Sequence, residues 1–420
     1  MKYNVCVIGG GLSGVAAAVA AARGGAKTLL VERSGALGGA MSNSFVYPFM
    51  RFWGVDENNN ERLLSKGIFS EMRERHAAKL GVSIDSFPMR DFKPEYYKFI
   101  LDDMCVEAGV DLLFHTVLTG VSTEGERVSG VTLSSKSGDM TVEADYFIDA
   151  SGDGDLFAFA GCEFELGRPE DGFCQPMTTC FRMSGVDKEK YLEEKENLQA
   201  LYKEHRASGN IRNPRENILV FWGIGDGILH FNTTRVVKCD PTDPFAISRA
   251  EVEARAQIHE IVTFLQKNSE AFRDSVLISV ATDIGVRESR RLIGRHVLTA
   301  EELLNCADFP DTIALGNYDI DIHNPAGTGT NIHYFKLNEF YRIPYRSLLP
   351  KEYNNLLVAG RCISATHEAQ AAVRVMPICA CLGEAAGTAA ALALKDGIGA
   401  PDVDFTTLRN TLTENGAAIL

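Results

Sequence analysis

The sequence has little of what metal, iron–sulfur and nucleic-acid-binding proteins require. Its ten cysteines include no Cys-x-x-Cys pair, which argues against a zinc or iron–sulfur site. Basic residues are in the minority, with 42 Lys and Arg against 56 Asp and Glu, and the formal net charge is −14. Nucleic acids and anionic membranes select basic surfaces, so neither is expected as a partner. We predict no metal site.

The sequence pattern also lacks a secretory signal and a membrane span. The first four residues lead directly into an apolar strand, without the charged lead or small-residue cleavage site of a signal peptide. Apolar runs such as residues 16–22 are much shorter than a bilayer span requires. We therefore expect a cytoplasmic protein. In that reducing compartment most cysteines, Cys379 and Cys381 included, are expected to be free thiols in the core.

A glycine-rich turn near the N-terminus is the first feature that carries chemistry. Residues 3–8 form an apolar strand, and Gly9-x-Gly11-x-x-Gly14 leads from it into an Ala-rich helix. Gly9 permits a tight turn, Gly11 lets the backbone approach a pyrophosphate, and Gly14 packs the helix against the strand. The helix N-terminus offers partial positive charge to the phosphates. The predicted contacts of this turn are Gly9, Gly11, Leu12, Ser13 and Gly14.

A second strand follows the helix and ends at an acidic residue. Residues 28–31 form this strand, and Glu32 follows Gly14 by 18 residues, the position of a carboxylate that binds a ribose hydroxyl. The resulting βαβ unit predicts a dinucleotide site. It does not separate FAD from NAD, so a flavin-free NAD(P)-dependent dehydrogenase stays open at this point.

Two further segments resemble the glutathione-reductase-like FAD flavoproteins. The run from Glu32 to Gly38-Gly39 resembles their E-x-x-x-x-x-G-G motif, which lines the pyrophosphate and the flavin ribitol. Residues 148–154 resemble their A-T-G strand motif, with Ser151 in place of Thr. The resemblance implies FAD as the cofactor, with contacts from Arg33, Gly38, Gly39, Ala150, Gly152 and Asp153. For Asp153 and Asp155, capping of the loop is an equal alternative.

The second half of the chain resembles a bacterial FAD-dependent oxidoreductase family related to the fumarate reductase and succinate dehydrogenase flavoproteins. The resemblance is carried by residues 285–291, 321–323, 343–350 and 356–394. It implies that a helix starting at Met376 faces the pyrimidine edge of the flavin, with contacts from Met376 and Ile378. Gly360-Arg361 stands where many relatives carry Gly-Asp or Gly-Glu against the ribitol. Gly360 is kept as a contact, and Arg361 is expected to reach a phosphate or a flavin carbonyl.

Two candidate substrate residues come from the middle of the chain. Arg287, Arg290 and Arg291 have two alternative interpretations. They form either a helical charged run, solvated or salt-bridged to neighbours such as Glu288, or a site in which an arginine binds an anionic substrate. His323 ends an alternating strand, residues 319–323, and is interpreted as a proton-transfer residue rather than a metal ligand.

Two more candidates lie between the last strand and the last long helix. His367 and Arg374 fall in the stretch where fumarate-reductase-like enzymes hold a substrate carboxylate with a His and an Arg. The resemblance therefore implies a substrate contact for both. Flavin binding or support of the loop is the alternative.

The order of the expected elements predicts an α/β fold with two parts. A Rossmann-type FAD-binding domain, made of a parallel sheet with a β-meander, is expected to be split by an inserted α+β substrate or cap domain. At 420 residues the chain is long enough for both. The predicted limits are 1–165 and 331–420 for the FAD-binding domain and 166–330 for the insertion. Residues 140–143 and 146–149 are expected as separate strands.

The resemblance implies an FAD-dependent oxidoreductase. We expect it to transfer a hydride between flavin N5 and a small polar organic substrate, by C=C reduction or by CH–CH or CH–OH oxidation. An electron-transfer flavoprotein subunit that works with a partner protein is the alternative from another class. A small-molecule substrate is the expected partner, and a homo-oligomer is compatible with the sequence.

Overall fold

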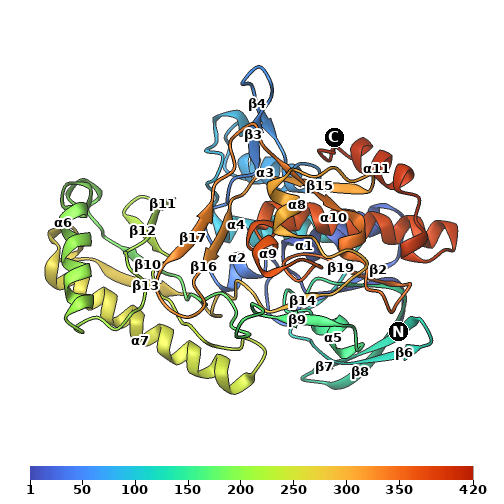
Figure 1. The fold of residues 1–420 in the computed structure, drawn as a ribbon, viewed down its shortest axis with the longest axis horizontal. Coiled ribbons are helices and arrows are strands. Elements are labelled where there is room, and N and C mark those ends of the chain that lie inside the picture. The colour runs from blue at the N-terminus through green and yellow to red at the C-terminus, as the bar shows by residue number, and fades with distance from the viewer. Residues whose placement is uncertain (420) are drawn as a thin grey trace.

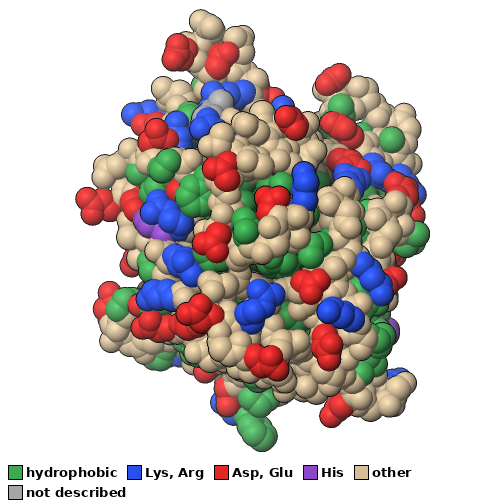
Figure 2. All heavy atoms as spheres, turned by 90° about the vertical axis from the view of Figure 1, so that its right-hand side faces the viewer, with side chains coloured by type: hydrophobic (Ala, Val, Ile, Leu, Met, Phe, Trp, Pro, Cys, Tyr) green, Lys and Arg blue, Asp and Glu red, His purple; other side chains and the backbone are tan. Residues whose placement is uncertain are grey.

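The computed structural model describes residues 1–419 and shows two parts of different architecture (Figure 1). The larger part is built on a sheet of seven strands, and the smaller on a four-stranded antiparallel sheet with two long helices. Figure 2 shows the face at the right of Figure 1, where acidic and basic side chains are interspersed. The net charge of −14 is therefore not gathered into one acidic patch on that face.

The large sheet has the order β5-β2-β1-β8-β7-β6, and β19 pairs with β8. β5, β2, β1 and β19 run parallel to the second half of β8, and β1, β2 and β19 are apolar and mostly buried, as expected of strands covered on both faces. The bounds are β1 (Lys2–Ile8), β2 (Thr28–Val31), β5 (Asp111–Leu113), β6 (Val117–Glu124), β7 (Arg127–Ser135), β8 (Gly138–Asp149) and β19 (Leu356–Val358).

β8 belongs to both the meander and the parallel sheet. Its first half pairs antiparallel with β7, and its second half pairs parallel with β1 and β19. The expectation of two separate strands here was wrong. Residues 139–149 contain no Gly or Pro, so nothing in this stretch turns the chain.

α1 (Leu12–Arg23) and α10 (Met376–Asp396) pack closely against each other. A Cβ at Gly383 would lie 1.9 Å from the Ser13 carbonyl oxygen, and one at Gly387 would lie 2.1 Å from that of Ala17. α10 is long and apolar enough to cross a bilayer, but 89% of its most apolar window is buried inside the protein. It is a core helix. The other helices of the larger part are α2 (Ala40–Asn43), α3 (Ile68–Lys79), α4 (Pro94–Glu107), α5 (Asp155–Phe159), α8 (Ala300–Leu304), α9 (His367–Val373) and α11 (Phe405–Glu414).

The smaller part has a hydrophobic core of its own. Its sheet has the order β11-β12-β10-β13, and the rings of Phe181 and Phe231 stack at 4.4 Å between its strands. Phe264 of α7 and Phe272 belong to the same cluster of buried residues. The bounds are β10 (Phe181–Ser184), α6 (Lys188–Ala207), β11 (Val220–Gly225), β12 (Ile228–Phe231), α7 (Pro244–Asn268) and β13 (Val276–Val280).

Two-stranded ladders complete the fold. The pairs are β3 (Trp53–Val55) with β4 (Glu61–Leu63), β9 (Phe164–Leu166) with β14 (Arg290–Leu292), β15 (Thr312–Gly316) with β18 (Tyr341–Pro344), and β16 (Ile320–His323) with β17 (Thr330–His333). The β16–β17 hairpin extends from the larger part toward the smaller one (Figure 1). The predicted limit at residue 330 falls inside this ladder, and the domain limits remain a prediction. The predicted fold class is confirmed.

The expected helical conformation of Arg290 and Arg291 was wrong, whereas the expected ion pair with Glu288 is present for Arg291. Both residues lie in β14, which pairs with β9. Arg291 is almost fully buried and binds the carboxylates of Glu288 and Glu165. Backbone pairing with β9 and these two ion pairs keep the segment extended.

Candidate functional site

The glycine-rich turn lies at the edge of the sheet where the parallel strands end. Gly9 has a φ of +101°, and a Cβ there would lie 2.4 Å from the Ala150 carbonyl oxygen. A Cβ at Gly14 would lie 1.8 Å from the Gly9 carbonyl oxygen. Only glycine fits these two positions, because the turn, the helix and the end of β8 pack without room for a side chain.

Gly11 differs from its two neighbours in the motif. Its φ of −66° suits any residue, and it is the N-cap of α1 without a side-chain hydrogen bond to the first turn. A Cβ added there would meet nothing within 4 Å. Leu12 and Ser13 follow in the first turn, where backbone N–H groups lack partners inside the helix. The backbone at Gly11 thus borders open space beside a free helix N-terminus.

The second glycine pair lies directly against the first motif. The Gly38 N–H donates to the Gly10 carbonyl oxygen at 2.8 Å, and a Cβ at Gly39 would lie 2.9 Å from Gly11 Cα. The buried carboxylate of Glu32 accepts hydrogen bonds from the backbone N–H groups of Gly10 and Ser34, each at 2.7 Å. These contacts fix both glycine segments and the acidic residue in one cradle.

Arg33 leaves this cradle and reaches the inserted part. Its guanidinium pairs with Asp283 at 2.5 Å, and its side chain is 67% exposed. The ion pair ties the end of β2 to the segment after β13. The predicted cofactor contact of Arg33 stays a prediction.

The loop after β8 is held by a buried carboxylate. Asp149 accepts hydrogen bonds from the Ser151 N–H and hydroxyl and from the Phe157 N–H. Burial raises the pKa of Asp149 to about 6. These hydrogen bonds hold the loop that contains Ala150 and Gly152 against the end of β8, and Gly152 adopts a φ of +82°.

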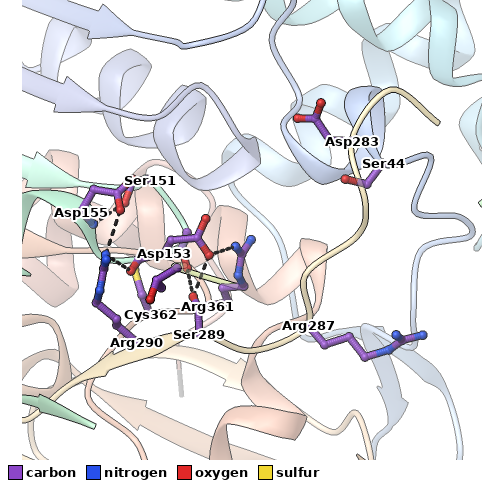
Figure 3. A network of polar contacts seen from close by, with 12 residues as sticks. Ser44, Ser151, Asp153, Asp155, Asp283, Arg287, Ser289, Arg290, Arg361 and Cys362 are labelled. Atoms are coloured by element: carbon purple, nitrogen blue, oxygen red, sulfur yellow. Dashed lines mark hydrogen bonds and ion pairs between the residues drawn. The ribbon is translucent and has the colours of Figure 1, made fainter. Parts of the chain in front are cut away.

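Asp153, Ser289 and Arg361 form a polar network next to this loop (Figure 3). Asp153 pairs with Arg361 at 2.5 Å and accepts from the Ser289 hydroxyl at 2.7 Å. Burial opposes ionisation, but the charge of Arg361 together with the hydrogen bonds from Ser289 and Arg361 lowers the pKa of Asp153. Asp155 pairs with Arg290 at 2.9 Å. Both aspartates therefore tie the loop to arginines. The cofactor contacts of Asp153 and Arg361, and the alternative that the aspartates cap the loop, stay predictions.

The end of β19 and the start of α10 meet the glycine-rich turn. Gly360 has a φ of +97°, and a Cβ there would lie 2.8 Å from the Ser13 hydroxyl. α10 begins after Val375 without a side-chain cap, with Met376 half-buried and Ile378 fully buried in its first turn. The C-terminal signature is therefore brought against the N-terminal motif, as the split domain requires.

Arg287 is directed away from the Asp153 network (Figure 3). One of its terminal nitrogens donates to the Pro176 carbonyl oxygen at 2.6 Å and to the Thr178 hydroxyl at 2.8 Å. Burial and the charges of Arg374 and Arg215 lower the pKa of Arg287 to about 9. The side chain still carries its charge at neutral pH, close to two other arginines.

His323 and Asp321 of β16 belong to the same region. The His323 Nε2 lies 3.4 Å from Asp321 Oδ2, which also accepts from the Tyr318 hydroxyl at 2.8 Å. The His323 Nδ1 lies 3.3 Å from a terminal nitrogen of Arg235. Because a guanidinium only donates, Nδ1 accepts, and we assign the proton to Nε2, facing Asp321. Arg374 reaches the Asp321 carbonyl oxygen at 3.4 Å.

The pKa values of both side chains, His323 and Asp321, are lowered, which keeps the histidine neutral and the aspartate charged. Burial and the neighbouring Arg287 lower the pKa of His323 to about 3, so the imidazole is neutral. Burial opposes ionisation of Asp321, but hydrogen bonds from His323 and Tyr318 and the charge of Arg374 hold its pKa well below the ordinary value. Neutral imidazole and charged carboxylate therefore face the arginines together.

His367 has a different environment from the other three predicted substrate residues. Its Nδ1 binds the fully buried Glu288 at 2.7 Å, and the same carboxylate oxygen accepts from Arg291. Only 4% of His367 is exposed. These contacts hold α9 against the start of β14 and fit the loop-support alternative, and a substrate contact of His367 stays a prediction.

Sequence reasoning missed Arg215, Arg235 and Tyr318. Arg215 lies in the turn-forming run Asn213-Pro214-Arg215-Glu216-Asn217, and Arg235 follows β12 without any recognisable motif. Tyr318 stands three residues before Asp321, and this closeness was the one available signal. The other two are brought in by tertiary packing.

Comparisons with known proteins give the family. A family model described as FAD dependent oxidoreductase matches residues 4–412. Mitochondrial dihydrolipoyl dehydrogenase from Schizosaccharomyces pombe is 30% identical over 156 residues, which cover 36% of this chain and 28% of that enzyme. The chain thus matches well under half of that curated relative.

Two solved structures illustrate the structural likeness. A geranylgeranyl bacteriochlorophyll reductase-like protein from Thermoplasma acidophilum has a TM-score of 0.49 at 13% identity, over 99% of this chain and 84% of that chain. The p-nitrophenol 4-monooxygenase from Pseudomonas putida DLL-E4 has a TM-score of 0.46 at 10% identity, over 99% and 86%. Likenesses of this size carry no argument about chemistry.

The cofactor is FAD, and the glycine-rich edge fits it. The open space at Gly11, the uncapped start of α1 and the Gly38-Gly39 backbone form a cradle for a pyrophosphate. Glu32 has the carboxylate that a ribose requires. These residues would hold the dinucleotide, and the end of β19 with the start of α10 would hold the flavin end. A flavin-free dehydrogenase is thereby set aside.

Proposed function

Because the chain belongs to the FAD-dependent oxidoreductase family, we propose that it transfers a hydride between its flavin and a small carboxylate-bearing substrate. The observation that carries this proposal is the convergence of Arg287, Arg374 and His323, which come from three separate segments. Charged donors of this kind bind carboxylates strongly in a partly buried site. The substrate lies, in this proposal, between the β10–β13 sheet and the β16–β17 hairpin.

In this proposal, different residues bind the substrate and hold the proton. FAD, when bound, accepts or delivers the hydride at N5. Arg287 and Arg374 bind and orient the substrate carboxylate. The hydrogen-bonded set of Tyr318, Asp321 and His323 holds the proton that accompanies the hydride, because Asp321 accepts from both neighbours.

Reduction of an activated C=C bond is the first reaction to test. The inferred relationship with the fumarate reductase and succinate dehydrogenase flavoproteins supports it, and CH–CH or CH–OH oxidation is the reverse or alternative chemistry. We place the enzyme in the cytoplasm, with a small molecule and no nucleic acid or membrane as its partner. A homo-oligomer is compatible with this proposal.

The test is an anaerobic reoxidation screen of the purified holoenzyme. The flavin is reduced chemically, and its visible absorbance is followed after addition of unsaturated carboxylates or of the corresponding neutral amides. We expect carboxylates to reoxidise the flavin. The loss of a charged hydrogen bond in Arg287→Gln should slow this by roughly ten- to hundredfold.

The matched control is Arg255→Gln, an exposed arginine of α7 that pairs only with Glu251 along the helix. This variant should reoxidise at the wild-type rate. Equal rates with amides and carboxylates would remove the basis for the proposed substrate class.

A further inference from the structure

Arg215 is held in place by a loop packed between the small sheet and the β16–β17 hairpin. The Asn213 side chain accepts from the Arg215 N–H at 3.2 Å and donates to the Thr233 carbonyl oxygen at 2.9 Å. Thr233 follows Asn232, whose side chain lies 3.4 Å from Arg287. The backbone of Arg215 is therefore fixed beside the residue that contacts Arg287.

Glu216 anchors the other end of the same loop. Its carboxylate pairs with Arg235 at 3.3 Å and accepts from the Gly329 N–H at 3.4 Å, in the turn of the β16–β17 hairpin. Arg235 in turn contacts His323. The loop thus spans from the small sheet to the hairpin that carries the proposed proton-transfer residues.

The guanidinium of Arg215 has free donors although the residue is only 6% exposed. Its Nε donates to the Asn217 side chain at 3.1 Å. Within residues 1–419, neither terminal nitrogen has a hydrogen-bond partner or a carboxylate in ion-pair range. The terminal nitrogens are not fully enclosed, so they face accessible space from a side chain that is otherwise buried, and these donors therefore point to a ligand.

The charges around this point do not balance. Four arginines of this region, Arg215, Arg235, Arg287 and Arg374, are opposed by two carboxylates. These are Asp321 and Glu216, and the charge of Glu216 acts on both Arg215 and Arg235. His323 is neutral and adds nothing. Two positive charges are left over, in a protein whose net charge is −14.

We propose that Arg215 completes a site for a substrate with two negative charges. Arg287 and Arg374 bind one acidic group, and Arg215 binds the second. The inference rests on the proposed function and narrows its substrate class to small dianions, either dicarboxylates or acids that carry a phosphate. In this assignment Arg215 selects the substrate by charge, from a loop outside every motif of the sequence.

The test measures anion binding by thermal denaturation of the holoenzyme, because a ligand that binds the folded state raises Tm. The anions are succinate, butyrate and inorganic phosphate, at equal ionic strength set with sodium chloride. Succinate and butyrate have the same chain length and differ in one carboxylate. We expect succinate to bind more tightly than butyrate, and Arg215→Gln to remove this difference by weakening succinate roughly ten- to hundredfold.

Two further variants make the result specific. Arg215→Lys keeps the charge and should retain part of the preference for succinate. Arg212→Gln removes an exposed arginine from the same loop, one that pairs with Glu260, and should behave as the wild type. Without anions, Arg215→Gln should not lower Tm, since it removes an uncompensated charge. Tighter binding of phosphate than of succinate, lost in Arg215→Gln, identifies the phosphate-bearing class.

The two levels of the proposal fail separately. If succinate and butyrate raise the Tm of the wild type equally, and only Arg287→Gln abolishes this rise, the dianion inference is wrong. The proposed function with a carboxylate-bearing substrate then stands. If no anion raises Tm, and Arg287→Gln reoxidises its flavin at the wild-type rate, both the dianion inference and the proposed function are wrong.

Discussion

At the scale of single residues, the three glycines of the N-terminal motif have two different tasks. Gly9 and Gly14 are required by packing, since a Cβ at either would overlap backbone atoms. Gly11 has ordinary backbone angles and open space around it. The fold does not require a glycine here, and we infer that the missing side chain serves the ligand.

This difference predicts the outcome of two alanine substitutions. Gly11→Ala should leave the Tm of the FAD-free protein unchanged and weaken FAD binding by at least about tenfold, because the new methyl group occupies the approach to the backbone. Gly14→Ala should lower the stability of the FAD-free protein by about 1–3 kcal/mol, the usual range for overpacking. Thermal denaturation and titration with FAD, followed by quenching of its fluorescence, measure the two effects. A large loss of stability in Gly11→Ala would contradict this assignment.

At the scale of elements, α10 connects distant parts of the chain. Gly383 and Gly387 bring it against α1, and Glu384 between them reaches α3. Gly67, the N-cap of α3, has no side chain to cap the helix, and Glu384 accepts the Ile68 N–H at 2.9 Å instead. A carboxylate from another helix therefore replaces the local cap.

Glu384 should make stability depend on pH. Burial raises its pKa to about 7 from an ordinary value of 4.5. The folded protein thus holds this proton more tightly than the unfolded chain, so the contribution of Glu384 is complete below its unfolded pKa and is lost as the pH rises through about 7. Glu384→Gln keeps an acceptor for Ile68 without a charge. From acidic to mildly alkaline pH, the free energy of unfolding of Glu384→Gln should therefore rise by up to roughly 3 kcal/mol relative to that of the wild type.

Thermal or urea unfolding of both proteins at several pH values measures this gain. Glu74→Gln is the matched control. Glu74 is exposed and lines the same cavity of about 750 Å³ as Glu384, and its pH profile should follow the wild type. Parallel profiles of wild type and Glu384→Gln would show that the carboxyl is not perturbed.

At the scale of the whole molecule, two cores support different halves of the function. The large core includes α1, α10 and the parallel strands, and the smaller one includes Phe181, Phe231 and Phe272. The predicted dinucleotide contacts lie on the large core. Arg215 and Arg287 depend on the loops of the smaller part.

Because the two parts have separate hydrophobic cores, we expect a substitution in one core to leave the other part folded. Phe231→Ala removes a ring that stacks on Phe181 and should destabilise the smaller part by about 3–5 kcal/mol. The purified variant should still retain FAD, while the Tm gain from succinate disappears. Flavin absorbance after gel filtration and denaturation with succinate measure the two properties. Loss of FAD together with the succinate effect would show that the two parts unfold as one unit.

Local patterns predicted the dinucleotide half of the protein well. The turn at Gly9, the strand before Glu32 and the helix from Met376 are encoded by short-range preferences, because glycine, apolar strands and proline-led helices act over a few residues. The same reasoning divided β8 into two strands and placed Arg290 and Arg291 on a helical charged face. In both cases the pairing partner, which is distant in sequence, determined the conformation.

The sequence by itself determined the family, the cofactor and the split of the nucleotide-binding fold across the chain. These follow from motifs in which each residue acts on its neighbours or on the cofactor backbone. Tertiary packing alone brings Arg235 to His323, places Arg215 near Asp321 and separates His367 from the other candidates. Isolated arginines carry no local signal, and their role depends on which charges the fold leaves unpaired around them. The substrate side of the site is therefore a property of the packing between the two parts.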